Sequence, residues 1–296
     1  MTSSFYKRVG LVIELFVFAL KAAAFLFVSG AVLFSETLHS FADIFDSLFV
    51  YIGFRLSRRE PDERHPFGYG KETFFWALVT ALFMVAVTAT LSIVKGVNQL
   101  VAPQPLYHVG FGIFSLAVGL IFSLLTLVMG IHVVFKGKKP SWTRFGSYLD
   151  PSIKVKIAED VAAVFGNLLA MAALYLYYIT GHLYYDGAAG IIIGLTLAVL
   201  GFMIALECKE LIIGRSASKN QRKAIERAAE SVAGVVRVMD LKTMLMGPDE
   251  MLVNIEVNLV DGLNTDTIEL LLDEIRLRIE KAVPEARHIQ VEVESI

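Results

Sequence analysis

The segment LHSFADIFDS, residues 38–47, places an imidazole and two carboxylates inside an apolar stretch. In a helix His39 and Asp43 are four residues apart and Asp46 follows three later, so all three lie on one face. An ionisable side chain at the centre of a bilayer costs at least about 2.5–3.5 kcal/mol, so it must face protein, water or an ion. The spacing predicts half of a metal site, and the alternative is a structural polar patch bonded to neighbouring helices.

The other half of such a site needs a second apolar segment that carries charge. Lys21 lies in an early segment, and Glu159 with Asp160 lie in KVKIAEDVAAVFGN, residues 154–167. Lysine repels a cation, so the acidic pair is the expected partner of the first half. Imidazole and carboxylate must both lose a proton to bind a metal, so binding is linked to pH and proton-coupled exchange follows.

Composition indicates the surroundings of these groups. The chain has 296 residues, of which 55% are hydrophobic, and its mean hydropathy is +0.61. These values are typical of a membrane protein, with the lipid bilayer as its solvent. The net charge of −2 predicts no nucleic-acid partner. Cys208 is the single cysteine, which excludes an internal disulfide and a metal site built from thiolates alone.

Six apolar segments are long enough to cross a membrane as helices. They cover approximately residues 9–33, 36–56, 72–100, 108–135, 155–181 and 186–213. If the segments alternate in direction, the flanking cations fall on one side, which predicts that both termini are cytoplasmic. These cations are Lys7, Arg8, Arg55, Arg58, Arg59, Arg64, Lys136, Lys138, Lys139, Arg144, Lys209 and Arg215.

After Gly214 the pattern becomes that of a water-soluble fold. Helical, strand, strand, helical and strand patterns follow in that order, and Asn264 or Thr265 is the expected cap of the second helix. About 80 residues in this order predict a three-stranded sheet with two helices on one face, related to the split βαβ layout. We therefore expect an α-helical membrane domain of six spans at 1–213 and a cytosolic α+β domain, αββαβ and ferredoxin-like, at 214–296.

The chain resembles the cation diffusion facilitators. The resemblance rests on LHSFADIFDS, on RREPDERHPFGYGK at 58–71, on the acidic fifth segment and on the C-terminal pattern. It resembles the branch with HPFGYGKE and an ED pair in the fifth span, which includes mitochondrial zinc-transporter relatives. The resemblance implies six-span metal–proton antiporters with a metallochaperone-like cytosolic domain that pairs into homodimers.

The resemblance also implies a transport site formed by His39, Asp43 and Asp160. A divalent cation and protons would compete for these groups during alternating access, giving secondary-active efflux coupled to proton antiport. The expected partners are the cation, protons, the bilayer and a second copy of the chain. No cofactor and no enzymatic activity are expected, and the cell (inner) membrane is the expected location.

Lys156 departs from the family pattern, because zinc members have a histidine four residues before the fifth-span aspartate. Either Lys156 lies at the membrane surface, or the fourth ligand comes from Glu159, Asp46 or water. An oxygen-rich shell admits manganese, iron or cobalt, and zinc remains the first expectation. Lys21 is expected to point into the bundle toward a carboxylate such as Asp46.

Two accessory sites of the family are expected to be altered or absent. Asp62 matches the first residue of a loop site, but Tyr69 stands where a histidine is expected, with His65 nearby. In the C-terminal domain, acidic residues stand where family members bind zinc through histidines, and they are typical of a solvated sheet face. These residues are Glu256, Glu292 and Glu294.

Two other classes of function stay open from the sequence. One is a non-transporting metal sensor or partner membrane protein of the same fold, which the altered Lys156 position favours. The other is an intramembrane hydrolase whose metal activates water, which would need a nucleophile or general base beside the ligands.

Overall fold

The computed structural model describes residues 2–135 and 151–294, with side-chain surroundings for 12–132 and 156–294. It divides the chain into two compact units. The helical unit comprises residues 1–51 and 76–207, and the second unit comprises residues 52–75 and 208–296. Four of the flanking cations that predict the orientation lie outside the described residues: Lys136, Lys138, Lys139 and Arg144.

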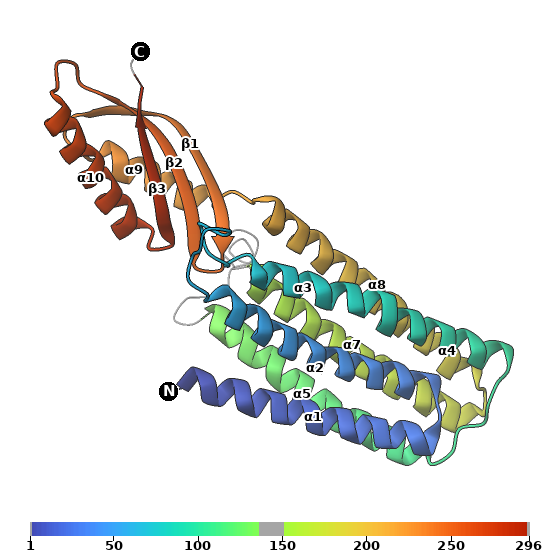
Figure 1. The fold of residues 1–296 in the computed structure, drawn as a ribbon. Helices are drawn as coiled ribbons and strands as arrows, with labels where there is room; N and C mark the ends of the chain where they lie inside the picture. Colours follow the sequence, from blue (N-terminus) through green and yellow to red (C-terminus); the bar gives the residue numbers. More distant parts are fainter. Residues whose placement is uncertain (1, 136–150, 295–296) are drawn as a thin grey trace. The chain divides into compact units, whose positions relative to one another are not determined.

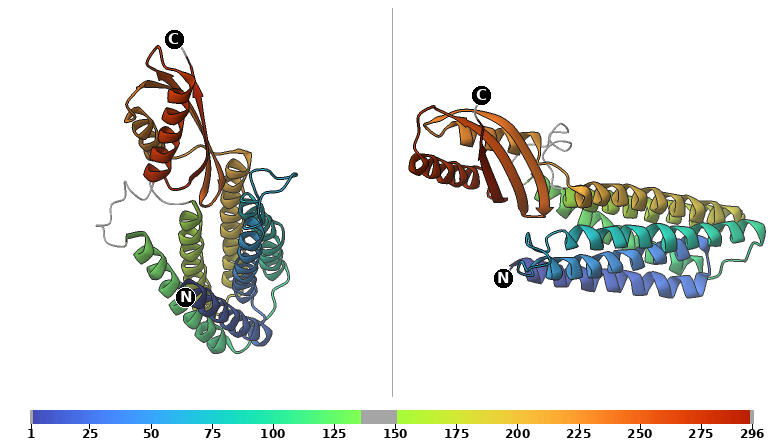
Figure 2. Two further views of the ribbon diagram at one scale, coloured as in Figure 1. Left: turned by 60° about the vertical axis from the view of Figure 1, so that its left-hand side comes forward. Right: turned by 45° about the horizontal axis from the view of Figure 1, so that its top comes forward.

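Long helices that pack side by side build the helical unit (Figures 1 and 2). All six predicted apolar segments are helical, and the third consists of α3, a π-helical turn η1 and α4 in succession. The elements are α1 (Thr2–Val28), α2 (Ala31–Ser57), α3 (Glu72–Phe83), η1 (Met84–Ala89), α4 (Thr90–Val101), α5 (Val109–Phe135), α7 (Pro151–Thr180) and α8 (Tyr184–Ile213).

Four helices in the described residues are long and apolar enough to cross a membrane. The helix α2 is not among these four, because it carries several acidic side chains: Glu36, Asp43 and Asp46. The four helical stretches are Glu72–Val101, Val109–His132, Lys156–Thr180 and Tyr184–Ile213.

The break between the first two segments differs from the prediction. The first segment was expected to cover 9–33, but the chain turns at Ser29, where φ is 60°, and α2 begins at Ala31. Asp186 causes this early start, because its carboxylate accepts hydrogen bonds from the backbone N–H groups of Ala31 (2.7 Å) and Val32 (3.0 Å). Asp186 is itself fully buried, so this cap lies inside the helical unit.

Small residues of α8 allow close helix contacts, as the segment GAAGIIIG predicts. A Cβ atom added at Gly187 would lie 2.9 Å from the backbone oxygen of Gly96, and one added at Gly194 would lie 3.0 Å from the backbone nitrogen of Ile93. Glycine is therefore required where α8 meets α4.

The C-terminal module, residues 219–293, has the predicted order of elements. They are α9 (Lys219–Glu230), β1 (Val235–Gly247), β2 (Glu250–Leu259), α10 (Thr265–Ala282) and β3 (Ala286–Val293). The sheet order is β1-β2-β3; β1 pairs with β2 in antiparallel fashion, and β2 pairs with β3 in parallel fashion. Ile255 of β2 pairs with Leu241 on one side and with Val291 on the other.

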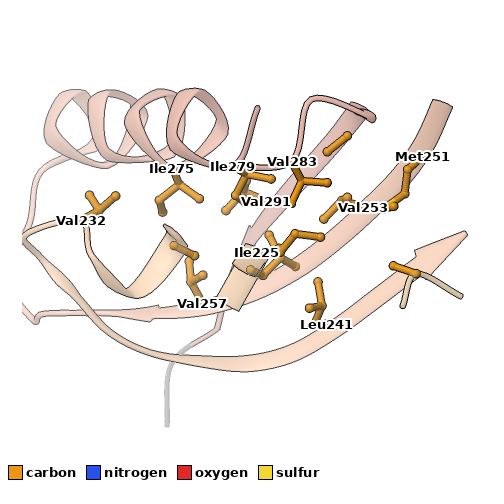
Figure 3. Close-up of a cluster of buried hydrophobic side chains, with 14 of the residues drawn as sticks. Ile225, Val232, Leu241, Met251, Val253, Val257, Ile275, Ile279, Val283 and Val291 are labelled. Carbon is orange, nitrogen blue, oxygen red and sulfur yellow. The ribbon is translucent and has the colours of Figure 1, made fainter. Parts of the chain in front are cut away.

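The module core lies between the sheet and its two helices (Figure 3). Alternate residues of β2 point into the core, and four of them are fully buried: Met251, Val253, Ile255 and Val257. Ile225 of α9 and Ile275 and Ile279 of α10 cover this face and are fully buried as well. Burial of each such side chain contributes about 1.5–3 kcal/mol, so the apolar pattern specifies the fold.

Local capping sets the start of each helix in the module. Ser218 forms a reciprocal capping box with Gln221 at the start of α9. The Asn264 side-chain oxygen accepts a hydrogen bond from the Thr267 backbone N–H at 2.8 Å, so Asn264 and not Thr265 caps α10.

Candidate metal site in the helical unit

His39 and Asp43 lie one turn apart on α2, as the spacing predicts. The His39 side chain is 3% exposed, and its Nε2 atom lies 3.7 Å from Asp43 Oδ1. This buried nitrogen has no hydrogen-bond partner among the described residues. Two ligands at about 2 Å from one tetrahedral ion lie about 3.3 Å apart, so this pair needs little movement to bind the same ion.

The acidic pair of α7 faces the same region. Asp160 is 6% exposed and Glu159 is buried to the same degree. Asp160 Oδ1 accepts a hydrogen bond from the Thr126 hydroxyl of α5 at 3.1 Å. A Cβ atom at Gly166 of α7 would collide with Glu36 Oε1 of α2, so α7 lies against α2 one helical turn from His39.

Lys156 faces these acids. Its Nζ atom lies 3.6 Å from Glu159 Oε2, and its side chain is half-exposed. It also interacts electrostatically with Asp43, Asp46 and Asp160. Because its ammonium group is directed at Glu159, Lys156 does not simply point outward at the surface; it supplies positive charge beside the acidic pair of α7.

The structure brings the five predicted residues to one region but not to coordination distance. They are His39, Asp43, Asp46, Glu159 and Asp160. Within residues 2–135 and 151–294, no three His, Cys, Asp or Glu side chains lie close enough together to hold an ion as they stand. The arrangement has the right donor types on two neighbouring helices, and an ion would have to draw the α2 and α7 ligands together.

Sequence reasoning missed two residues beside this region. The Thr126 hydroxyl of α5 donates a hydrogen bond to Asp160. In the sequence, Thr126 could have been noticed as a hydroxyl residue three positions after Ser123 on a mostly apolar helix. Glu14 of α1 accepts a hydrogen bond from the Ser47 hydroxyl at 2.7 Å and interacts electrostatically with Asp43. Glu14 could have been noticed in the sequence in the same way as Lys21, because both are charged residues inside the first predicted membrane span.

Lys21 points into the bundle as expected, but its partner is different. Its Nζ atom donates a hydrogen bond to Glu36 Oε2 at 2.7 Å, not to Asp46. Glu36 fell at the edge of the second predicted segment, because that segment was expected to start at 36. With α2 beginning at Ala31, Glu36 lies inside the helix.

The loop before α3 contains the altered accessory site. The Tyr69 hydroxyl donates a 2.6 Å hydrogen bond to Asp62, and His65 Nδ1 lies 3.5 Å from the other oxygen of Asp62. The hydrogen bond from Tyr69 is the main reason that the pKa of Asp62 is lowered. Tyr69 therefore occupies one carboxylate oxygen that a metal would need.

The acidic residues of the module sheet have protein partners. Glu256 lies 3.7 Å from Lys242, and Glu292 accepts a hydrogen bond from the Asn254 amide at 3.5 Å. Glu294, at the end of β3, is exposed. These contacts agree with a solvated sheet face.

Two family models match the chain. The cation efflux transmembrane domain matches residues 8–213, and the cytoplasmic domain of cation efflux proteins matches residues 217–296. Among solved structures, the MamM CTD in a nickel form is 17% identical and has a TM-score of 0.25, covering 26% of this chain and 98% of that one.

Curated relatives span much of the chain. The proton-coupled zinc antiporter SLC30A9, mitochondrial, of Xenopus laevis is 30% identical over 88% of this chain and 48% of its own length. The cation-efflux pump FieF of Klebsiella pneumoniae is 22% identical over 90% of this chain and 84% of its own length. The chain spans about half the length of the SLC30A9 and Metal tolerance protein C4 relatives that it matches.

These relatives are cation transporters and not enzymes, which leaves the hydrolase alternative without support. The first model covers well over half of the chain, and it includes both α2 and α7 with their acidic residues. The chain therefore belongs to the cation efflux family, the cation diffusion facilitators, and is a multi-pass integral membrane protein.

Proposed function

We propose that the chain exports a divalent cation, with zinc as the first candidate, in exchange for protons. One observation supports this proposal: among the described residues, the buried His39 Nε2 atom has no hydrogen-bond partner and lies 3.7 Å from Asp43 Oδ1, while Asp160 is buried on α7. Burial of such groups is costly unless an ion or a proton occupies them. The SLC30A9 relatives are named proton-coupled zinc antiporters, which supports the same choice.

The same ligands would serve both cargoes. With the site open to one side, deprotonated His39, Asp43 and Asp160 collect a cation. After the helices rearrange to open the other side, protons compete for these groups and release it. Glu159 and Asp46 supply further negative charge, and Lys156 offsets part of it when no cation is bound. Manganese, iron and cobalt remain alternatives because carboxylates suit harder ions.

The architecture that we propose has six spans at 1–213 and a cytosolic domain at 214–296, with both termini in the cytoplasm. α1 and α2 complete the six spans if their charged side chains face the bundle. A homodimer formed through the C-terminal module is supported by the ZT_dimer family model and would cover the edges of a three-stranded sheet. For the membrane, we keep the cell (inner) membrane, although the first relatives are named as mitochondrial.

The test uses the purified chain in vesicles with a pH-sensitive dye inside. A zinc gradient is expected to drive proton flux in the unaltered protein and none in Asp160→Asn, because the amide cannot offer an anionic ligand. Glu159→Gln is the matched control one residue away and is expected to retain part of the flux. Undiminished flux in Asp160→Asn would remove that residue from the site.

The non-transporting alternative has one observation in its favour, the ammonium group of Lys156 at 3.6 Å from Glu159. A tethered cation in this position could hold the site closed to other ions. Under this alternative the unaltered protein binds zinc but moves neither zinc nor protons, so the same vesicle assay separates the two functions.

A further inference from the structure

A second buried charged layer lies beside the metal region. Lys21 of α1 and Glu36 of α2 are 3% and 0% exposed, and their charged atoms lie 2.7 Å apart. Glu36 stands three residues before His39, so it lies one helical turn nearer to the end of α2 that Asp186 caps. The layer is thus separate from the metal region but adjoins it.

Glycines on two other helices make room for this pair. A Cβ atom at Gly166 of α7 would collide with Glu36 Oε1. A Cβ atom at Gly119 of α5 would lie 2.7 Å from Lys21 Cε and 2.8 Å from Asn167 Oδ1. The layer is therefore built by four helices, and only residues without a side chain fit at these two positions.

Two buried oxygen atoms in this layer have no donor. Glu36 Oε1 and the amide oxygen of Asn167 lack a hydrogen-bond partner among the described residues, and both side chains are fully buried. A buried acceptor without a donor costs about 1–3 kcal/mol. The Lys21 ammonium beside Glu36 repels a divalent cation, so the missing donor is a proton on the carboxylate or a water molecule.

We infer that Glu36 is a proton-binding site distinct from the metal site, through which the exchanged proton passes between the His39 region and the Asp186-capped end of α2. This inference rests on the proposed function. Glu36 Oε1 accepts a proton from a hydronium ion on one side: one O–H bond of the hydronium breaks, an O–H bond forms on Glu36, and a water molecule is left. On the other side the Glu36 O–H bond breaks, and a water molecule takes the proton and becomes hydronium.

The charges around Glu36 fit this role. Lys21 on α1 donates a hydrogen bond to the second carboxylate oxygen, Oε2, and leaves Oε1 unoccupied. The facing groups from α5 and α7 are Gly119, Gly166 and Asn167, none of which titrates. His39 is the next titratable group on α2. From α8, Asp186 is occupied by the N–H groups at the start of α2.

The first experiment measures zinc-driven proton flux in vesicles that contain the full chain. Glu36→Gln is expected to lower the flux about a hundredfold, the lower end of what a positioned proton-transfer group contributes, while zinc affinity stays unchanged. Glu36→Asp, which still titrates, is expected to retain part of the flux. Loss of flux in Glu36→Gln together with an equal loss of zinc affinity would overturn the inference.

A structural role of the ion pair is separated by a double variant. Lys21→Met combined with Glu36→Gln removes both charges and leaves no unpaired one, so it also serves if Glu36→Gln alone does not fold. If the pair only joins α1 to α2, this variant transports at the original rate, which overturns the inference. If Glu36 carries the proton, the flux stays low.

A second readout does not need transport. Infrared difference spectra of the purified chain, recorded on lowering the pH, are expected to contain a buried carboxyl C=O band that is missing in Glu36→Gln and present in Glu269→Gln, an exposed control. Identical spectra for all three proteins would overturn the inference. Absence of zinc-driven proton flux in the unaltered chain would instead contradict the proposed function, and the spectra would still decide the role of Glu36.

Discussion

The helical unit and the C-terminal module both bury apolar side chains, but they differ in what else they bury. Among the described residues of the module, Asn258 at 9% exposure is the one buried polar residue, and the core cluster itself is apolar. The helical unit buries several ionisable groups among its described residues, which include Lys21, Glu36, His39, Glu159, Asp160 and Asp186.

This difference separates stability from function. Apolar burial is favourable by itself, so the module core needs no further explanation. Buried charge is unfavourable unless each group is paired, and a paired group is seldom more stabilising than an apolar one of the same shape. The charged groups of the helical unit therefore point to a role in moving ions, whereas the module core points to a role in holding one fold.

The largest stability effect is expected in the module. Ile279→Ala should lower the local opening free energy of the module by about 2–5 kcal/mol, because it leaves a cavity in a core position that is fully buried. Hydrogen exchange of β2 amides in the full chain measures this change. Zinc binding at the helical unit should stay the same.

Leu270→Ala on the same helix is the matched control. Leu270 is 71% exposed, so its removal should change the opening free energy by less than about 0.5 kcal/mol. Equal effects of the two substitutions would show that this core does not determine the stability of the module.

The module could be predicted from sequence because its determinants are local. Period-two alternation in β2, amphipathic spacing in α10 and a cap at Asn264 all lie within a few residues of the elements that they set. The helical character of the six apolar segments was also predictable from their length, and hydropathy indicates a membrane span for four of them within the described residues.

The rest depended on contacts between distant residues. Asp186 caps α2 from 155 positions away, so the true start of that helix and the burial of Glu36 could not be read locally. Thr126 supports Asp160 from another helix, and neither residue reveals the other by spacing. The residues of the candidate metal site stay a prediction, and the contact between Thr126 and Asp160 beside them could not be predicted from spacing.

A smaller change in free energy is expected from the substitution of Thr126. Thr126→Val removes the hydroxyl that donates a hydrogen bond to Asp160 and keeps the side-chain shape. Loss of a group that orients a ligand typically costs about 10–100-fold in metal affinity, so zinc titration of the purified chain should show at least about a tenfold loss. Module stability should not change, which is the converse of the Ile279→Ala result.

Thr196→Val provides the control for the threonine substitution. Among the residues that the structure describes, the Thr196 hydroxyl bonds within its own helix, to the Ile192 carbonyl oxygen at 2.9 Å. An equal loss of zinc affinity in both variants would mean that Thr126 acts through general helix packing and not through Asp160.

The smallest effect should come from the cap of α10. Asn264→Ala removes the side-chain oxygen that accepts from the Thr267 backbone N–H, at a cost of about 1 kcal/mol. Hydrogen exchange at the first turn of α10 should accelerate, while Asn264→Asp, which keeps an acceptor, should leave it nearly unchanged. Thr265→Ala tests the other residue that the sequence allows as a cap. If Thr265→Ala accelerated exchange and Asn264→Ala did not, Thr265 would be the local cap. If neither substitution accelerated exchange, the start of α10 would not depend on a local cap, and the contrast with the distant cap of α2 would disappear.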